Sequence, residues 1–371
     1  MKILILSRDI YGETGGVSAA LADACRKSGI EYEVTDPSVI VSEVKDESAG
    51  SGIIKRTHKK LMGVVQKAGD FLDRAMGLSS VDLTSSESSE KLFSYINEGV
   101  FDAVICACPQ ATSAMGAVRK LKGSKVPCYG VLSDYFIPPY LEDTGLDGYF
   151  IPHSDLRNAK GIQDLSDGSV FVSGIPVRQR FGSDFSKKEA RNYLIIPKSR
   201  RVYLILSQGM SRNTVIGVCD ELIKSEAGDY AVYVLAERGS EILEKLSDRY
   251  ACAQQMHIVT FTEKFSVYMK AADAVIAKPY AQTVTEAAVA GVPLVLISPD
   301  SEAQFRNSDF AASHEVAVTA NGSKDAAAKA QRFALENALA ARIVKMQDVN
   351  ILRGAADKIL ELVTQKRAAA L

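Results

Sequence analysis

The sequence lacks the features that would place it in several specialised classes of protein. Its 371 residues carry a formal net charge of -1, which gives no electrostatic reason to expect a nucleic-acid partner. No apolar run approaches the roughly 20 residues that a membrane-spanning helix needs. The first residues, MKILILS, lead directly into RDIYGETGG without a cleavage-like region. We therefore expect a first strand there and not a signal peptide.

Recognisable metal-binding patterns are also missing. None of the four histidines lies near another at metal-ligand spacing, and no Asp-x-Asp pair occurs in the chain. The six cysteines are scattered, several of them inside apolar runs, as expected for reduced, buried thiols of a cytosolic protein. Cys106 and Cys108 form one close pair that alternation in a strand would place on one face, but a metal would need two more ligands. We therefore expect no metal and no cofactor.

The sequence does contain a regular alternation of short apolar runs with helical segments. A chain of this length normally forms more than one domain. The expected strands are 3–7, 31–35, 103–106, 128–132 and 170–172, followed by a second series at 202–206, 231–235, 257–260, 274–277 and 294–297. Alternation of this kind predicts parallel sheets. We therefore predict an α/β fold with two doubly wound Rossmann-like domains that face a cleft.

The boundary between the two domains is expected just after GIPV at 174–177, where the charged segment RQRFGSDFSKKEARN begins. This places the first domain at 1–177 and the second at 178–354. The last helix, 355–371, is amphipathic and can pack on either domain, including back onto the first.

The stretch AVIAKPYAQTVTEAAVAGVPLVLIS, residues 274–298, is the most informative one. It predicts a strand, a polar loop, a small-residue helix, a turn and a buried strand. Thr283 can cap the helix, with Glu286 three residues later. The Glu286 carboxylate either accepts the backbone N–H of Thr283 in a capping box, or binds the ribose hydroxyls of a nucleotide whose phosphates lie at the helix N-terminus. Both interpretations fit this segment.

One segment interrupts the alternation, from Gly52 to Met76. Its apolar residues recur at helical spacing, and its polar side is rich in lysine and arginine. Such a helix either lies on an anionic membrane surface or flanks a domain and covers its core with lysine stems.

Several motifs, taken in order, resemble the diacylglycerol glycosyltransferases of the two-Rossmann-domain (GT-B) fold. They are SDY at 133–135, DGYFIP at 147–152, GIPV followed by Phe181, TFTEKFSVYMKAADAVIAKP at 260–279, and TVTEAAVAGVPLVLISP at 283–299 continuing into Glu302 and Asn307. The similarity covers roughly Phe101 to Val318, with a weaker match at the N-terminus. A more distant similarity is to the GlcNAc transferase that acts on the lipid-linked peptidoglycan precursor.

The resemblance implies an inverting, metal-independent transferase that moves a hexose from a UDP-sugar to a lipid hydroxyl such as that of diacylglycerol. It implies that Glu286 holds the ribose and that the loop after Leu206 cradles the pyrophosphate. It also implies a location at the cytoplasmic face of the membrane, where residues 52–76 would meet an anionic surface. The expected donor-binding residues are Ser207, Gln208, Gly209, Met210, Ser211, Phe261, Thr262, Lys278, Thr283, Glu286, Ser301 and Glu302. Lys278 either adds charge to the leaving group or is a solvated loop lysine.

The departures from the family pattern concern the acceptor side, to which we assign Gly12, Gly15, Gly16 and Tyr135. The histidine expected after the glycine-rich turn GETGG is Val17 here, and the one expected after the SDY-like motif is replaced by Pro138 and Pro139. Asp134 is then the best candidate to deprotonate the acceptor, although it can also be a turn or N-cap aspartate. Glu13 is a weaker candidate.

Two further departures keep a second class of function open. The phosphate loop reads SQGMSRNT, and the glutamine of the family's sugar-binding loop appears as Ser301. A catalytically degenerate protein that binds a nucleotide-sugar or a partner without transfer is the alternative. A UDP-sugar epimerase of the same fold is a third possibility, for which the paired acid and base residues are missing.

Overall fold

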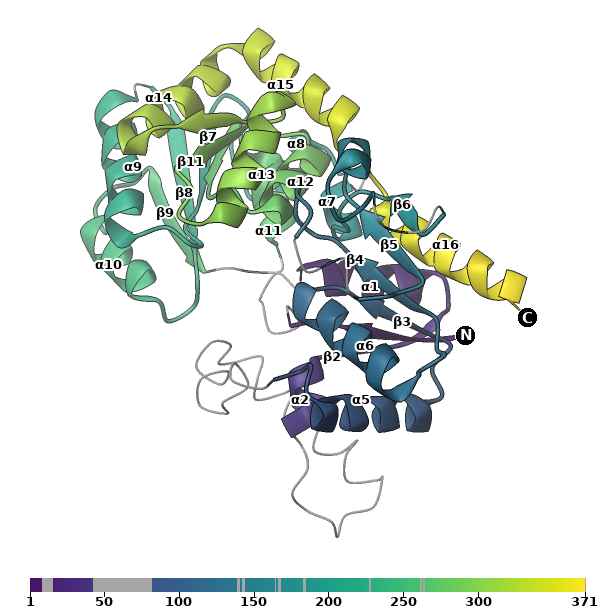
Figure 1. The fold of residues 1–371 in the computed structure, drawn as a ribbon. Coiled ribbons are helices and arrows are strands. Elements are labelled where there is room, and N and C mark those ends of the chain that lie inside the picture. Colours follow the sequence, from purple (N-terminus) through teal and green to yellow (C-terminus); the bar gives the residue numbers. More distant parts are fainter. Residues whose placement is uncertain are drawn as a thin grey trace. The chain divides into compact units, whose positions relative to one another are not determined.

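The computed structural model describes residues 1–8, 16–42, 82–138, 141, 144–163, 165, 168–182, 185–226, 228–260, 262 and 264–370. The chain forms two compact units (Figure 1). The first comprises 1–133, 137–178 and 354–371, and the second comprises 134–136 and 179–353. The chain passes from the first unit into the main part of the second between residues 178 and 179, one residue beyond the boundary expected from the sequence. The residues predicted to form a membrane-surface helix, 52–76, lie outside the described part of the chain.

The first unit contains a six-stranded parallel sheet in the order β2-β1-β3-β4-β5-β6. Its strands are β1 Lys2–Leu6, β2 Glu31–Thr35, β3 Ala103–Cys106, β4 Cys128–Val131, β5 Gly148–Ile151 and β6 Val170–Val172. Its helices are α1 Gly16–Lys27, α2 Pro37–Ser42, α5 Ser86–Gly99, α6 Pro109–Lys122, the 3-10 helix η4 Ser154–Asn158 and α16 Ala355–Ala370. α5 and α6 supply one core cluster, while α16 packs against α1, with Lys27 and Asp357 paired at 3.1 Å.

The second unit contains another six-stranded parallel sheet, in the order β12-β11-β10-β7-β8-β9. Its strands are β7 Arg201–Leu206, β8 Tyr230–Ala236, β9 Met256–Thr260, β10 Ala274–Ala277, β11 Leu294–Ile297 and β12 Val318–Ala320. Numbered within the unit, this is the 3-2-1-4-5-6 order of the Rossmann fold read from the other edge. The strand order therefore reverses between β7 and β10, where such folds bind their ligands.

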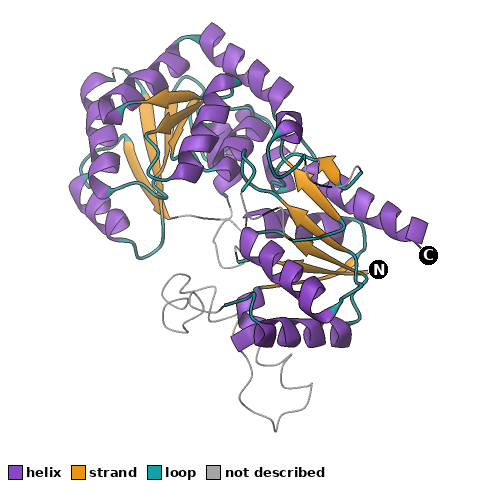
Figure 2. Ribbon diagram, in the orientation of Figure 1, coloured by secondary structure: helices purple, strands orange, loops and turns teal. Residues whose placement is uncertain are grey.

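Helices flank both sheets, as the purple ribbons around the orange strands in Figure 2 show. Those of the second unit are α7 Gln179–Gly182, α8 Lys187–Tyr193, α9 Arg212–Ser225, α10 Glu241–Arg249, α11 Phe265–Ala271, α12 Ala281–Ala290, α13 Glu302–Ser313, α14 Gly322–Leu335 and α15 Asn337–Asn350. The predicted fold class of two Rossmann-like α/β units is confirmed. Within the described residues, no helix combines the length and apolar composition needed to cross a membrane.

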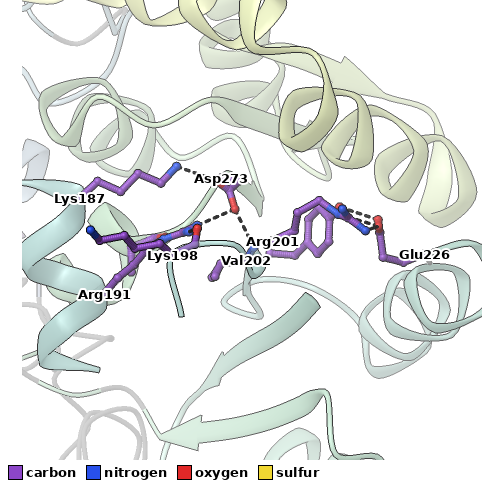
Figure 3. A network of polar contacts seen from close by, with 9 residues as sticks. Lys187, Arg191, Lys198, Arg201, Val202, Glu226 and Asp273 are labelled. Carbon is purple, nitrogen blue, oxygen red and sulfur yellow. Dashed lines mark hydrogen bonds and ion pairs between the residues drawn. The ribbon is translucent and has the colours of Figure 1, made fainter. Parts of the chain in front are cut away.

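A network of ion pairs holds the amino edge of the second sheet together (Figure 3). Asp273 directly precedes β10 and accepts hydrogen bonds from Lys187 Nζ at 2.6 Å, from Arg191 Nη2 at 2.7 Å and from the backbone N–H of Val202 at 2.7 Å. Arg191 is buried and also donates to the carbonyls of Ala271 and Lys198. The network therefore ties α8 to the beginnings of β7 and β10.

The cysteines of the described residues are free thiols, of which five are buried and Cys252 is exposed. The expectation of buried thiols is therefore wrong for Cys252, which lies in the turn before β9. Cys106 and Cys108 both belong to the core of the first unit, where Cys106 Sγ lies 3.7 Å from Cys128 Sγ. Burial raises the pKa of the Cys106 thiol well above its usual value, so that it stays neutral.

Candidate functional site

Three loops meet at the carboxyl edge of the second sheet, around the point where the strand order reverses. They follow β7, β10 and β11, which are neighbours in the sheet, at residues 207–211, 278–280 and 298–301. Lys278 Nζ donates to the carbonyl of Ser298 at 2.5 Å, which joins the second loop to the third. A ligand that binds in the Rossmann manner would contact these loops.

The helix that begins in this region, α12, starts earlier than the sequence predicts. Its N-cap is Tyr280, whose side chain makes no capping hydrogen bond, and Thr283 is the third residue of the helix. The capping-box interpretation of Thr283 and Glu286 is therefore wrong, because Thr283 already has helical neighbours on both sides. The first intrahelical bond runs from Val284 N–H to the Tyr280 carbonyl at 3.0 Å. The N–H groups of residues 281–283 thus precede the helical ladder and have no side-chain cap.

The helix after β7 differs, because its N-terminus is capped. Ser211 is the N-cap of α9, and its Oγ accepts from the backbone N–H of Thr214 at 3.1 Å. Within the loop before it, Ser207 N–H donates to the Leu235 carbonyl and Met210 N–H to the Ser207 carbonyl. Of the two helix starts at the switch point, α9 therefore has an N-cap side chain that bonds its first turn, and α12 has an N-cap side chain that does not.

Glu286 lies one turn inside α12, with its side chain only 4% exposed. Its Oε1 accepts a hydrogen bond from Gln282 Nε2 at 3.2 Å, one turn back along the helix. Glu286 is the single ionisable residue of α12. A buried carboxylate one turn inside a helix N-terminus is an arrangement that suits a ribose diol and its neighbouring phosphates.

Lys278 is buried, which excludes one of the two interpretations that the sequence offers for it. It is 5% exposed, and its Nζ pairs with Asp300 Oδ2 at 2.5 Å as well as with the Ser298 carbonyl. It is therefore not a solvated lysine. Its charge already has a carboxylate partner, so the ammonium holds the loop that leads into α13.

Ser301 and Glu302 lie at the start of α13. Ser301 is the N-cap, and its Oγ accepts from the Gln304 N–H at 3.2 Å. Glu302 pairs with Arg306 at 2.8 Å on the exposed side of the helix. Gln304, which the sequence did not single out, is buried, accepts from Asp300 N–H at 3.0 Å and hydrogen-bonds the Tyr280 hydroxyl.

Tyr280 was also missed, and it explains the one glycine in the predicted phosphate loop. A Cβ on Gly209 would lie 2.2 Å from the Tyr280 hydroxyl oxygen, and the φ of Gly209 is +71°. Only glycine therefore fits under this ring. The loop after β7 and the start of α12 are packed directly against each other at the switch point.

The candidate base, Asp134, belongs to a short segment, 134–136, that is part of the second unit. Its Oδ1 accepts from Asn307 Nδ2 at 2.9 Å, a bond to a residue 173 positions away. No helix begins at Asp134, so the N-cap interpretation is wrong. Burial raises the pKa of the Asp134 carboxyl above its usual value, and the hydrogen bond from Asn307 acts in the opposite direction.

Tyr135 lies in the second unit, whereas the sequence assigned it to the acceptor side. Its hydroxyl lies 2.7 Å from Thr285 Oγ1, and its ring stacks on Phe310 with centroids 4.1 Å apart and an interplanar angle of 5°. Thr285 donates to the carbonyl of Ala281, so the Tyr135 hydroxyl donates to Thr285. Tyr135 is 4% exposed, and these contacts anchor the segment to α12 and α13.

The remaining predicted residues are partly beyond the described chain. Gly12, Glu13, Gly15 and Phe261 lie outside it, and their assignments stay predictions. Gly16 begins α1 with a φ of +39°. Thr262 Oγ1 accepts from Lys264 N–H at 3.3 Å in the turn after β9. Gln208 is exposed in the loop after β7.

Comparison with known proteins gives one family match and several full-length similarities. Residues 207–321 match the glycosyltransferase family 28 C-terminal domain, which spans the whole candidate site of the second unit apart from 134–136. The processive diacylglycerol beta-glucosyltransferase of Bacillus pumilus is 23% identical over 347 residues, covering 87% of this chain and 84% of the relative.

Solved structures share the fold over nearly the whole chain. MurG of Acinetobacter baumannii superimposes with a TM-score of 0.62 at 13% identity, covering 98% of this chain and 99% of that one. UDP-GlcNAc 2-epimerase from Neisseria meningitidis, solved with UDP-GlcNAc bound, gives a TM-score of 0.63 at 12% identity and covers 99% and 100% of the two chains. These likenesses, at 12% and 13% identity, concern the fold alone.

The resemblance read from the motifs is thus confirmed by a domain match and by relatives that align along most of the chain. The matches support a transferase of glycosyl groups. Together with the two Rossmann-like units, they support the conclusion that the chain is a divergent relative of the diacylglycerol glycosyltransferases.

Proposed function

We propose that this chain is an inverting, metal-independent glycosyltransferase that moves a hexose from a UDP-sugar to a lipid hydroxyl such as that of diacylglycerol. The observation that carries the proposal is the start of α12. Its N-cap residue, Tyr280, makes no side-chain capping hydrogen bond, and the buried carboxylate of Glu286 lies one turn inside the helix. The names of the relatives, which include a diacylglycerol beta-glucosyltransferase, and the UDP-GlcNAc in one solved structure support the donor and acceptor classes.

In the proposed reaction, the acceptor oxygen attacks C1 of the hexose from the side opposite UDP. The new O–C1 bond forms while the bond from C1 to the diphosphate oxygen breaks, and the electron pair leaves with UDP. Asp134 takes the acceptor proton, a role that contributes roughly 10²–10⁴-fold in known enzymes. The first-turn N–H groups of α12 stabilise the charge that develops on the diphosphate. A single displacement inverts the configuration at C1.

Metal independence is supported by these N–H donors and by the absence of an Asp-x-Asp pair from the sequence. In this proposal Lys278 acts through its contacts with Asp300 and Ser298, which fix the loop before α13. Transfer that persists in excess chelator supports the proposal, and loss of transfer that a divalent cation restores contradicts it.

We also propose that residues 52–76 contact an anionic membrane at its cytoplasmic face, on the strength of their sequence pattern alone. Replacement of Lys59, Lys60 and Lys67 by glutamate should abolish co-sedimentation with vesicles that contain anionic lipid. Vesicles of neutral lipid are the control. If the natural protein and the glutamate variant bind anionic vesicles equally, residues 52–76 do not form the membrane contact.

The central test measures UDP release from UDP-glucose or UDP-galactose in the presence of diacylglycerol vesicles. We expect turnover by the natural protein, a product of inverted anomeric configuration, and a loss of at least about a hundredfold in kcat for Asp134→Asn. Asp325→Asn, which alters a partly exposed aspartate on α14, is the matched control.

The alternative of a binding protein without transfer is favoured by the two missing histidines. Calorimetry with UDP, together with the turnover assay, distinguishes the transferase from the binding protein. Tight UDP binding without turnover on a broad panel of donors and lipids would establish the binder and overturn the transferase. Undiminished turnover by Asp134→Asn would leave a transferase with a different base.

A further inference from the structure

The segment that carries Asp134 is fixed to the second unit at its backbone, its side chains and its aromatic ring. Asn307 Oδ1 accepts from the backbone N–H of Tyr135 at 2.9 Å, and the Tyr135 ring stacks on Phe310. The Tyr135 hydroxyl is bonded to Thr285 on α12. The position of the Asp134 backbone is therefore set by α12 and α13, the helices that flank the candidate donor site.

Asn307 is the residue that both of these backbone and side-chain contacts share. It is 2% exposed, and its amide has a defined orientation. A backbone N–H can only donate, so the Oδ1 atom of Asn307 must face Tyr135, and Nδ2 must then face Asp134. One buried amide thus contacts two consecutive residues of the segment.

The two oxygens of Asp134 have different surroundings. Oδ1 accepts from Asn307 Nδ2 at 2.9 Å. Within the described part of the chain, no donor is bonded to Oδ2, and the residue is half-buried, not fully enclosed. The carboxylate is therefore held through one oxygen and presents the other, as a general base must.

The charges on the surrounding helices do not replace this contact. α12 carries Glu286, and α13 carries Glu302, Arg306 and Asp309, with His314 at its C-cap. Glu302 and Arg306 are paired with each other. Burial raises the pKa of the Asp134 carboxyl, and the hydrogen bond from Asn307 lowers it. Asn307 thus donates a hydrogen bond that favours the ionised form of Asp134.

We propose that Asn307 is the positioning residue for Asp134, holding its carboxylate in one orientation and in the ionised form that can accept the acceptor proton. The inference rests on the proposed function, because it assigns to Asp134 the role of the base. A base must be unprotonated, so activity rises with pH through the pKa of Asp134. Loss of the Asn307 donor raises that pKa and moves the acidic limb of the activity profile to higher pH.

Two substitutions with different predicted sizes test the inference. Asn307→Asp preserves the volume and the acceptor for Tyr135 N–H, but removes the donor and places a like charge beside Asp134. Asn307→Leu removes the donor without adding a charge. We expect the Asp134 pKa to rise in the order natural protein, Asn307→Leu, Asn307→Asp, with a shift of at least about one pH unit for the last. The acidic limb of kcat should move by the same amount.

The Asp134 pKa is measured directly from its carboxyl carbon signal in protein labelled with ¹³C at the aspartate side chains, assigned by comparison with Asp134→Asn. Asn350→Asp is the matched control. It also loses an amide donor, here to the His314 carbonyl at 3.0 Å, and it should leave the titration of Asp134 unchanged. Because Asn307→Asp can still accept from Tyr135, it tests the inference even if Asn307→Leu does not fold.

The carboxyl titration separates failure of the inference from failure of the proposed function. The predicted pKa order supports the role of Asn307 even in a protein that shows no transfer. A pKa that is equal in the natural protein, Asn307→Asp and Asn350→Asp overturns that role, whatever the activity. If Asp134→Asn retains full turnover, Asp134 is not the base, and the positioning role falls with it.

Discussion

The two edges of the second sheet use their polar residues in different ways. At the amino edge, Asp273 receives three donors, and the buried Arg191 that faces it also reaches two backbone carbonyls (Figure 3). At the carboxyl edge, α12 begins without a side-chain cap and places Glu286 in a buried position one turn later. One edge satisfies its polar groups within the protein, and the other begins a helix at the switch point whose N-cap side chain makes no capping hydrogen bond.

This difference predicts that one edge of the sheet determines the stability of the fold and the other determines ligand binding. Groups that are fully bonded in the folded protein contribute to folding, because their removal leaves a buried partner unsatisfied. N–H groups left open at a helix start contribute little to folding and are available to an anion. The amino edge should therefore control unfolding, and the carboxyl edge should control the affinity for UDP.

The largest expected effect is at the amino edge, where Asp273→Ala removes the common acceptor of Lys187, Arg191 and Val202. We expect the free energy of unfolding to fall by about 3 kcal/mol, because Arg191 is left buried without its carboxylate. Denaturant titration measures the change. Asp229→Ala is the control, since the Asp229 pair with Arg200 is exposed and should contribute at most about 1 kcal/mol.

An unchanged unfolding midpoint for Asp273→Ala would contradict the prediction that the amino edge controls unfolding and the carboxyl edge controls the affinity for UDP. The same prediction also fails if the folded variant binds UDP at least about tenfold more weakly, which corresponds to about 1.4 kcal/mol in binding free energy.

The next largest effect is at the carboxyl edge, where Glu286→Gln should weaken UDP binding by tenfold to about a hundredfold. Charge-assisted hydrogen bonds contribute about 1.5–3 kcal/mol, and the two ribose hydroxyls would lose a charged acceptor. Calorimetry with UDP and with its 2′,3′-dideoxy analogue measures this loss for the hydroxyls alone. The natural protein should prefer UDP strongly, and the variant should bind both ligands nearly equally. An unchanged preference for UDP would show that Glu286 does not contact the ribose.

Most of the fold follows from the sequence, because buried parallel strands appear as short continuous apolar runs. Every strand that was predicted occurs within a residue or two of its expected position. The two strands that were missed are β5 and β12. β5, GYFI, begins with a glycine that follows Asp147 in a turn-like pair, and the three residues of β12 lie at the edge of the sheet with a partly exposed pattern, so neither gives a clear strand signal.

The site could be predicted less well, because its key contacts are not local. The pattern Thr283-x-x-Glu286 fits a capping box, but the helix has its N-cap at Tyr280, three residues earlier than that pattern requires. The contact between Asp134 and Asn307 joins residues 173 positions apart, and no local pattern indicates it. The sequence identified Glu286 and Asp134 through a family resemblance, whereas Tyr280, Gln304 and the role of Asn307 needed the structure.

The smallest expected effect tests whether the packing at the carboxyl edge is specific, by comparing two glycines with the same strained backbone. Gly209 and Gly239 have φ values of +71° and +70°, but a Cβ on Gly209 would meet the Tyr280 hydroxyl at 2.2 Å, whereas a Cβ on Gly239 would meet nothing within 4 Å. Gly239→Ala should therefore cost about 1 kcal/mol of stability, the cost of an alanine at positive φ.

Gly209→Ala carries the same backbone cost and must also displace the Tyr280 ring, which lies over the loop after β7 and hydrogen-bonds Gln304 at the start of α13. We expect an additional loss of about 1 kcal/mol in stability, as for other overpacked positions, and a several-fold weaker affinity for UDP. Gly239→Ala should leave that affinity unchanged. Because the backbone strain cancels between the two variants, any difference in UDP affinity comes from the displaced ring. Equal affinities would mean that Tyr280 packs beside the nucleotide site without shaping it.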